Sequence, residues 1–549
     1  MGLDKRLKKR IQQIDKNLDA IVKNPYEKVV TEPVSEPRPA WARWVFPLGG
    51  AFLSCCLALS IVLPLALTNK GVAPQVGDGD SAATEKPHGS EKGAPTSRDR
   101  TPMMGGGPND YGTYEEGVYT HENLNCLVSP TRQTTKAEIE DSMSETTYDS
   151  YKAFTKKFVT LVMNANNSVA EKSMAVSIPD AYLCLAITGI ISDQNCLQDV
   201  LDYLELDNMQ ALKNAARQIA SSLGTMTKDQ FGNDVGGLNL NSIWLNPEKA
   251  SLLEEKDEAL YEDLRDVFDA SLYFEGLTSN RAKQYIAENG LPGKPLPDIK
   301  LNSDNDPAAL SVMSTYYNID VFGVDQTYYQ NEFQDGGHTM NYTVNGQTKK
   351  VDFIERTTQY SCMYENDDFL GATMNMSNSN ISFFLPKSRT AMPSTILADV
   401  LDEDYSPKVF TYTEGGQQIN TAAYDVNISA PYFFLDNKLL LEQGDLSPLF
   451  PHLTSAGAGS RLAENKLNLP MFLSSIEQFS VMRFDFNGFY SCSATTATIE
   501  GATDTKIIAA ELVLNHPYVF TTSKNVSVGY NTRSVPTVIG EIVDPNYLI

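Results

Sequence analysis

The chain has 549 residues, of which 42% are hydrophobic and 21% are charged. This length exceeds one average domain of ~100–200 residues, and the apolar content suffices for a packed core, so wholesale disorder is disfavoured. The net charge of −25 disfavours a general nucleic-acid binder, because phosphate contacts require a basic face.

Motifs of the common enzyme and metal sites are missing from the sequence. No two of the five histidines are close enough to form a helical or hairpin metal pair, and the seven cysteines contain no CxxC motif. The Walker A, dinucleotide-binding, HExxH and GxSxG patterns are absent as well. Asp304, Asn305 and Asp306 resemble the start of a calcium loop, but its glycine and distal glutamate are missing, which favours a polar turn. We therefore expect no enzyme activity, no metal and no cofactor.

The first segment, residues 1–43, is a basic tail. Residues 1–44 hold ten Lys and Arg against six Asp and Glu, a charge of +4, so the remaining 505 residues carry −29. Leucines and isoleucines recur in the tail at helical spacing, which predicts an amphipathic helix suited to an anionic membrane surface.

Residues 44–68 form a run of 25 side chains without charge. A helix of ~20 apolar residues spans the hydrocarbon core, and Trp41 and Trp44 suit the interface, so we expect a single transmembrane helix. Positive charge favours the cytoplasmic side of the cell membrane, which places the tail in the cytoplasm and the body in the extracellular space. A cleaved signal peptide is disfavoured by the long basic lead, and a lipid on Cys55 or Cys56 is an open alternative.

Residues 69–145 are rich in Gly, Pro, Ser and Thr, which predicts a flexible linker with a typical reach of ~50 Å. The body, residues 146–549, begins with helical periodicity in 147–166 and 179–204. Strands are expected at 238–245, 360–374, 381–385, 426–434, 481–486, 509–514 and 535–543. Helices early and strands later, without regular alternation, predict an α+β domain.

The cysteines of the body do not predict a disulfide framework. Five cysteines lie outside the membrane run, an odd number with no paired spacing. Cys184 lies in the apolar run 182–187 and is expected to be a buried core thiol. Stability should therefore come mainly from the hydrophobic core.

Several segments of the body resemble the serpin superfamily in order and spacing. They are Met174–Pro179, Leu238–Trp244, Ala270–Phe274, Ala282–Gly290, Val312–Tyr317, Ser382–Pro386 and Ser429–Phe433, and the most specific are Leu514–Phe520 and Pro536–Pro545. The resemblance covers roughly 147–549. It implies a serpin-like fold with a large central β-sheet, further sheets and about eight or nine helices.

The resemblance also implies a function. A serpin presents an exposed loop to a serine or cysteine protease and acts as a suicide substrate, because the cleaved loop enters the large sheet as a new strand and carries the acylated protease with it. Here residues 487–514 occupy the loop position, and Gly488 matches the hinge glycine. The segment expected to enter first comprises Phe489, Tyr490, Ser491, Cys492, Ser493, Ala494, Thr495 and Thr496.

The cut bond is expected near Ala502-Thr503, about fourteen residues past Gly488. A small residue before the cut suits elastase-like or subtilisin-like proteases. Lys506 is the second candidate and would suit a trypsin-like protease. The expected partner is thus a target protease bound by a monomer that is tethered to the membrane and binds no nucleic acid.

Some residues depart from the inhibitory pattern. Phe489 and Tyr490 are bulky where inhibitors carry small side chains, which would slow insertion through overpacking. Ser314 stands where a central asparagine is expected, and Gln478 where a histidine is expected. The positions beside Pro179 that usually hold serine, and the acidic pair before the hinge glycine, are replaced by Ile178, Ala181, Phe486 and Asn487. These departures leave a non-inhibitory binding or structural module open, with inhibition as the favoured hypothesis.

Overall fold

The computed structural model describes residues 126–128, 142–166, 172–228, 234–255, 257–291, 296–321, 338–376, 379–414, 417–422, 424–466, 471–485, 488–493, 509–543 and 548. The expected tail, the expected membrane span and most of the expected linker lie outside these ranges. Within these ranges no helix is long and apolar enough to cross a bilayer. All of them belong to one compact unit, Pro102–Ile549.

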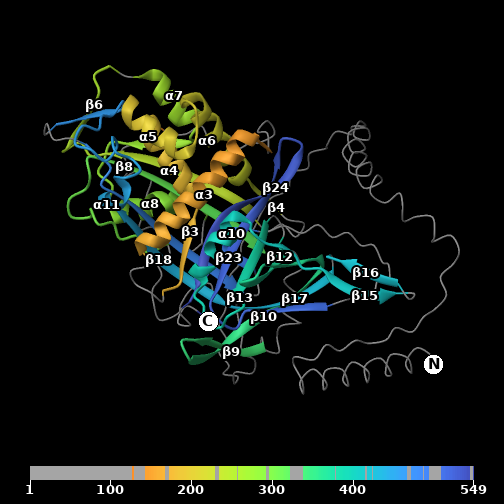
Figure 1. The fold of residues 1–549 in the computed structure, drawn as a ribbon. Helices are drawn as coiled ribbons and strands as arrows, with labels where there is room; N and C mark the ends of the chain where they lie inside the picture. The colour runs from red at the N-terminus through yellow and green to blue at the C-terminus, as the bar shows by residue number, and fades with distance from the viewer. Residues whose placement is uncertain are drawn as a thin grey trace, which may run out of the picture. The chain divides into compact units, whose positions relative to one another are not determined.

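The described residues form eight α-helices, four of which lie together (Figure 1). These four are α3 (Glu145–Asn166), α4 (Pro179–Ile190), α5 (Gln194–Leu204) and α6 (Met209–Leu223). The others are α7 (Glu258–Asp266), α8 (Ser279–Asn289), α10 (Leu397–Asp402) and α11 (Gln443–Leu446). In α3, Tyr151, Phe154 and Phe158 share one face at helical spacing and are buried, as the sequence predicts.

An eight-stranded sheet contains the strands that matter most for function. Its order is β1 (Cys126–Val128), β7 (Ala270–Tyr273), β5 (Asp234–Leu245), β8 (Leu310–Val321), β21 (Gly488–Ser493), β20 (Ser475–Asp485) and β18 (Phe433–Glu442), with β4 (Met226–Lys228) paired to β5. β5 and β8 pair antiparallel, as do β18 and β20. The first and last strands of this path are thus more than 300 residues apart in sequence.

A second eight-stranded sheet has the order β14 (Ser406–Pro407), β11 (Met363–Glu365), β12 (Phe369–Asn375), β13 (Ser379–Pro386), β23 (Tyr518–Val528), β24 (Asn531–Ile542) and β3 (Met174–Ser177), with β2 (Ser142–Met143) beside β23. A four-stranded sheet has the order β22 (Ala509–Val513), β17 (Tyr424–Pro431), β10 (Gln347–Ser361) and β9 (His338–Val344). Two hairpin-sized sheets join β15 (Phe410–Glu414) to β16 (Gln417–Thr421) and β19 (Ala463–Asn465) to β6 (Ala250–Leu252).

Helices cover both faces of the first sheet. Along β8, Val312 and Tyr316 pack in the cluster that contains α3 to α6, whereas Met313 and Tyr317 pack in a second cluster with α8. Successive strand residues point to opposite faces, so α4 and α8 lie on opposite sides of β8. Residues near the centre of this sheet are therefore enclosed from both sides.

The arrangement confirms the expected α+β class, with local differences. The expected strand 360–374 is divided, because the Asn366 side chain accepts the N–H groups of Asp368 and Phe369 and turns the chain between β11 and β12. Strands β1 and β2 lie within the range 69–145 that the sequence assigns to a linker. Asp304 does lie in a turn, where its carboxylate accepts hydrogen bonds from Ser279 at the start of α8.

Candidate functional site

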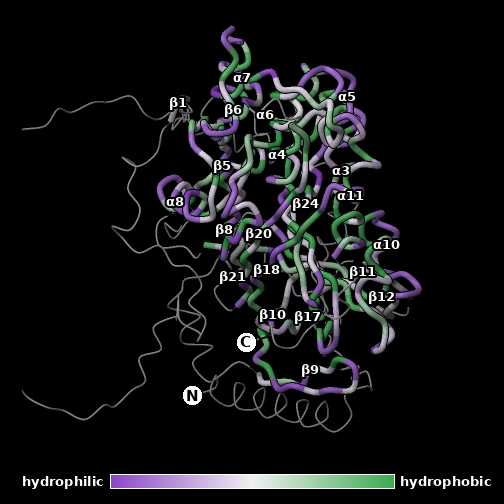
Figure 2. Tube along the Cα trace, turned by 90° about the vertical axis from the view of Figure 1, so that its left-hand side faces the viewer, coloured by the Kyte–Doolittle hydropathy of each residue, from purple (hydrophilic) through white to green (hydrophobic). Residues whose placement is uncertain are grey.

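The predicted hinge glycine begins a short strand inside the first sheet. Gly488, Phe489 and Tyr490 pair antiparallel with β20 on one side and with β8 on the other. Figure 2 shows β8, β21 and β20 next to one another. The register with β8 becomes irregular from Ser491 to Ser493. The first residues of the predicted loop therefore already lie between the two strands that the loop would separate.

A cavity of about 160 Å³ lies where β21 stops. Its walls include Val312–Tyr317 of β8 and Ile476–Met482 of β20, and α4 and α8 contribute side chains from the two faces. Within the described residues, these stretches pair only on their outer sides, β8 with β5 and β20 with β18.

Gln478 of β20 forms a polar link on the α4 side of this cavity. Its side-chain oxygen accepts the backbone N–H of Ser177 at 3.0 Å, and its Nε2 donates to the Ser177 carbonyl at 2.7 Å. Both residues are buried. The sequence identified Gln478 only as a replacement for histidine, and the structure assigns it a two-way hydrogen bond that ties β20 to β3.

Asp180, in the first turn of α4, also lines the cavity. Its Oδ2 lies 3.5 Å from Nε2 of Gln478. Burial raises the pKa of the Asp180 carboxyl to about 7, although the Ser177 hydroxyl and the N–H groups at the start of the helix act in the opposite direction. Sequence reasoning missed this residue. The available signal was an acid directly after a Pro in an otherwise apolar strand-to-helix segment.

Cys184 lies one helical turn beyond Asp180 and lines the same cavity. It is half-buried rather than enclosed in the core, so the expectation of a buried core thiol is wrong in this respect. Desolvation of the thiol beside β8 raises its pKa to about 12, with a smaller contribution from the Asp180 charge. The thiol is therefore protonated and a poor nucleophile at neutral pH.

Ser314 contributes to a second polar group on β8. Its hydroxyl donates to the Asn241 side chain at 2.6 Å, and Asn241 in turn donates to the carbonyl of Phe268. The Asn241 carbonyl accepts the hydroxyl of Tyr285 from α8. Ser314 thus binds the neighbouring strand β5.

The predicted site residues fall into two groups. Residues 488–493 form β21, as described above. Ala494, Thr495, Thr496, Ala502, Thr503 and Lys506 lie outside the described residues. The structure therefore describes the entrance of the loop into the sheet and the start of the next strand, β22, at Ala509.

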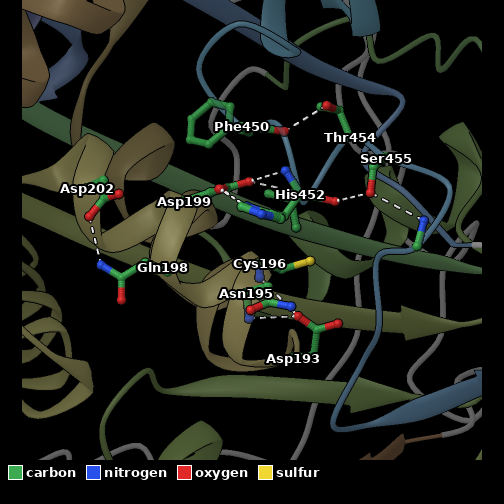
Figure 3. Close-up of polar contacts among 12 residues, drawn as sticks. Asp193, Asn195, Cys196, Gln198, Asp199, Asp202, Phe450, His452, Thr454 and Ser455 are labelled. Carbon is green, nitrogen blue, oxygen red and sulfur yellow. Dashed lines mark hydrogen bonds and ion pairs between the residues drawn. The ribbon is translucent and has the colours of Figure 1, made fainter.

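An Asp–His pair far from this cavity has the appearance of a catalytic dyad (Figure 3). Asp199 lies 2.7 Å from Nδ1 of His452 and accepts the backbone N–H groups of His452 and Leu453. The Ser455 hydroxyl donates to the His452 carbonyl and accepts from Gly457, so no hydroxyl described here binds the imidazole. These hydrogen bonds hold the turn 450–455 against α5. Groups of three or more candidate metal ligands are also absent from the described part of the chain.

The comparisons with known proteins show the fold. No family model and no curated protein matches this chain. The thermophilic serpin tengpin in its native state matches with a TM-score of 0.51 at 15% identity, over 74% of this chain and 96% of that one. Serpin48 of the insect Tenebrio molitor matches with a TM-score of 0.50 at 14% identity, over 72% and 97%. Human thyroxine-binding globulin, in complex with thyroxine, matches with a TM-score of 0.50 at 14% identity, over 73% and 99%.

Proposed function

The chain has a divergent serpin-like fold, and we propose that it inhibits a serine or cysteine protease as a suicide substrate. The observation that carries this proposal is the position of β21, between β8 and β20 and directly above the cavity. Strand and cavity lie in line, so the rest of the loop has a route into the sheet.

The register of β21 predicts where each loop residue would lie after insertion. Continuing the regular pairing of Gly488–Tyr490 places Thr495 opposite Ser314 of β8 and opposite Gln478 of β20. Antiparallel partners that lie opposite each other point to the same face. Gln478 points to the α4 side, so Thr495 would do so as well.

The residues that share this face are suited to burial. Alternation places Ser491, Ser493, Thr495 and Ala497 on the α4 side, and all four side chains are small. A strand added here gains main-chain hydrogen bonds to both neighbours without overpacking the space beside α4. Phe489 is the exception on this face.

The chemistry of the cut follows from the class of protease. The nucleophilic oxygen or sulfur of the protease forms a bond to the carbonyl carbon of Ala502, and the bond to the nitrogen of Thr503 breaks. The proton of the nucleophile passes through the base of the protease to the new amino group of Thr503. Insertion then moves the acyl-enzyme away from the loop's exposed position before water hydrolyses it.

We further propose that residues 44–68 anchor the protein in the cell membrane with the body outside. Support comes from the 25 uncharged side chains of this run and from the basic tail that precedes it. The small residue at Ala502 supports an elastase-like or subtilisin-like target. An alkaline carbonate wash of membranes that carry the full chain tests the anchor, because an integral protein stays in the pellet.

The experiment for inhibition mixes the compact unit Pro102–Ile549 with a panel of serine and cysteine proteases. We expect a covalent complex that survives detergent with at least one protease whose specificity pocket accepts small side chains. Cleavage of the loop by every protease without any such complex would overturn the proposal.

A non-inhibitory binding module is the second candidate, and the bulky Phe489 and Tyr490 favour it. Human thyroxine-binding globulin, a structure with the same fold, is described in complex with thyroxine. Cleavage within 494–503 discriminates between the two functions. A large rise in melting temperature after the cut signals insertion and contradicts the second candidate.

A further inference from the structure

The α4 side of the cavity has a polar end with two unsatisfied atoms. Asp180, at the second position of α4, and Ser177, the last residue of β3, both line the cavity. Oδ1 of Asp180 and Oγ of Ser177 are shielded from solvent and have no hydrogen-bond partner within the described residues. Buried polar atoms are normally paired, so two unpaired atoms on one cavity wall point to a ligand.

Apolar side chains surround this polar end. Phe158 of α3, Ala181 of α4, Val312 of β8 and Ile476 of β20 line the cavity and pack in the same hydrophobic cluster. The cavity volume of about 160 Å³ is close to that of an engineered apolar cavity of about 150 Å³ that binds benzene. The space therefore accommodates a molecule the size of one aromatic ring.

Among the described residues that surround Asp180, the titratable side chains include no cation. They are Cys184 of α4, Tyr316 and Tyr317 of β8, Glu477 of β20 and Tyr151 of α3. Burial raises the pKa of Cys184 and of Tyr151, so both stay neutral near pH 7. Glu477 alternates with Gln478 to the opposite face of β20, where it pairs with Lys438 at 2.6 Å. An ionised Asp180 thus lacks a counter-ion here, and a buried carboxylate without one is costly.

We propose that this cavity binds a small primary amine with an apolar body the size of one aromatic ring, and that Asp180 pairs with its ammonium group. The ammonium has three hydrogen atoms to donate. Asp180 Oδ1 and Ser177 Oγ accept two of them, and the apolar body packs beside Phe158 and Val312. Binding requires no movement of the loop, so this site is independent of the proposed inhibition.

Ionisation of Asp180 gives the binding a pH dependence. Burial raises the pKa of this carboxyl to about 7. An ammonium group is attracted to the carboxylate and not to the neutral carboxyl, and an alkylamine stays protonated between pH 6 and pH 8. The affinity for the amine therefore follows the ionised fraction of Asp180, which is about tenfold larger at pH 8 than at pH 6.

The test is isothermal titration calorimetry of the full chain with benzylamine at pH 6, 7 and 8. We expect the dissociation constant to fall about tenfold from pH 6 to pH 8, in line with the ionised fraction of one carboxyl. Benzyl alcohol has nearly the same shape without the charge. It should bind at least about tenfold more weakly than benzylamine at pH 8, because it cannot compensate the buried carboxylate.

Three variants locate the site. Asp180→Asn should weaken benzylamine binding about tenfold or more at pH 8 and remove the pH dependence, because the charge is gone. Glu477→Gln is the matched control, since it removes a carboxylate from the opposite face of the same cavity. It should keep the wild-type affinity and pH profile. Ala181→Leu fills the apolar part of the cavity and should abolish the binding of both ligands.

The outcomes decide separately on Asp180 and on the cavity. Equal affinities for benzylamine and benzyl alcohol at pH 8, or equal benzylamine affinities in wild type and Asp180→Asn, would overturn the role of Asp180. Failure of benzylamine to bind at any pH would overturn the site itself. If Asp180→Asn does not fold, the wild-type pH profile and the comparison with benzyl alcohol still decide. Trapping of a protease is measured separately, so neither result depends on the proposed function.

Discussion

Gln478 and Ser177 exchange two hydrogen bonds, in which the amide side chain of one residue binds the backbone of the other as a neighbouring strand would. Gln478 belongs to β20, which borders the gap, and Ser177 ends β3 of the other eight-stranded sheet. The pair therefore holds in place one of the two strands that must separate when the loop enters.

Replacement of Gln478 by alanine tests this link. Loss of two buried hydrogen bonds should destabilise the loop-expelled state by about 1–3 kcal/mol. Conversion to a loop-inserted form should become faster, measured as the rate at which heat-resistant monomer appears on warming. Gln198→Ala is the matched control, because the Gln198 amide binds Asp202 on the exposed surface of α5. Equal conversion rates for both variants would contradict the role of Gln478.

An arginine at Thr495 should abolish inhibition. If the pairing of Gly488–Tyr490 is continued through an inserted loop, this residue faces the α4 side, where an unpaired charge is costly. The body should then be cut as an ordinary substrate, without a covalent complex and without a gain in melting temperature. The control is Thr496→Arg, since the same continuation of the pairing gives this residue the opposite face and Glu477 as its partner on β20. If Thr495→Arg still traps the protease, the register is wrong.

A smaller residue at Phe489 should improve inhibition. Phe489 pairs with Phe484 of β20 in the sheet, and a smaller residue at this position reduces the volume that the inserted strand has to accommodate. We expect Phe489→Thr to trap a larger fraction of the target protease per loop cleaved, measured as the ratio of complex to cleaved product. Tyr490→Thr changes the opposite face and should have a smaller effect. A decrease in trapping by Phe489→Thr would indicate that the ring contributes to the mechanism.

The stability of the body should fall as the pH rises from 4.5 to 7. Glu541 is buried on β24, its Oε1 has no hydrogen-bond partner in the described structure, and burial raises the pKa of its carboxyl to about 7. Over this interval the native state retains a proton that the unfolded state has lost, so the free energy of unfolding decreases with pH. The decrease should amount to at most about 3 kcal/mol for this group.

Glu541→Gln should therefore be more stable than the wild type at pH 8 and should show a flatter pH dependence in urea unfolding. A control with the exposed Glu403, changed to Gln, should leave the slope unchanged. An identical slope in Glu541→Gln and wild type would show that the carboxyl titrates normally.

The sequence predicted the elements with strong periodicity. The buried face of α3 and the apolar α4 carry their pattern in the residues themselves. Strands β15 and β16 were not anticipated, because their Thr, Gln and Asn side chains carry little alternation of apolar and polar residues. The two strands pair with each other in a two-stranded sheet.

The sequence predicted only part of the candidate site, for a similar reason. The resemblance to serpins identifies the loop through Gly488 and the small residues of 491–498. The partnership of Gln478 with Ser177 joins residues 301 positions apart and leaves no local signal. The proximity of Asp180 to both depends on how α4 and β20 pack, which a single sequence does not specify.

The short strand β21 has a kinetic consequence. Adding a strand inside a sheet normally requires the two neighbours to part and the first residues to find their register. Here Gly488–Tyr490 are already paired with both neighbouring strands. The nucleation step of insertion is therefore complete before a protease binds. What is left after the cut is propagation along β8 and β20, residue by residue, in competition with hydrolysis of the acyl-enzyme.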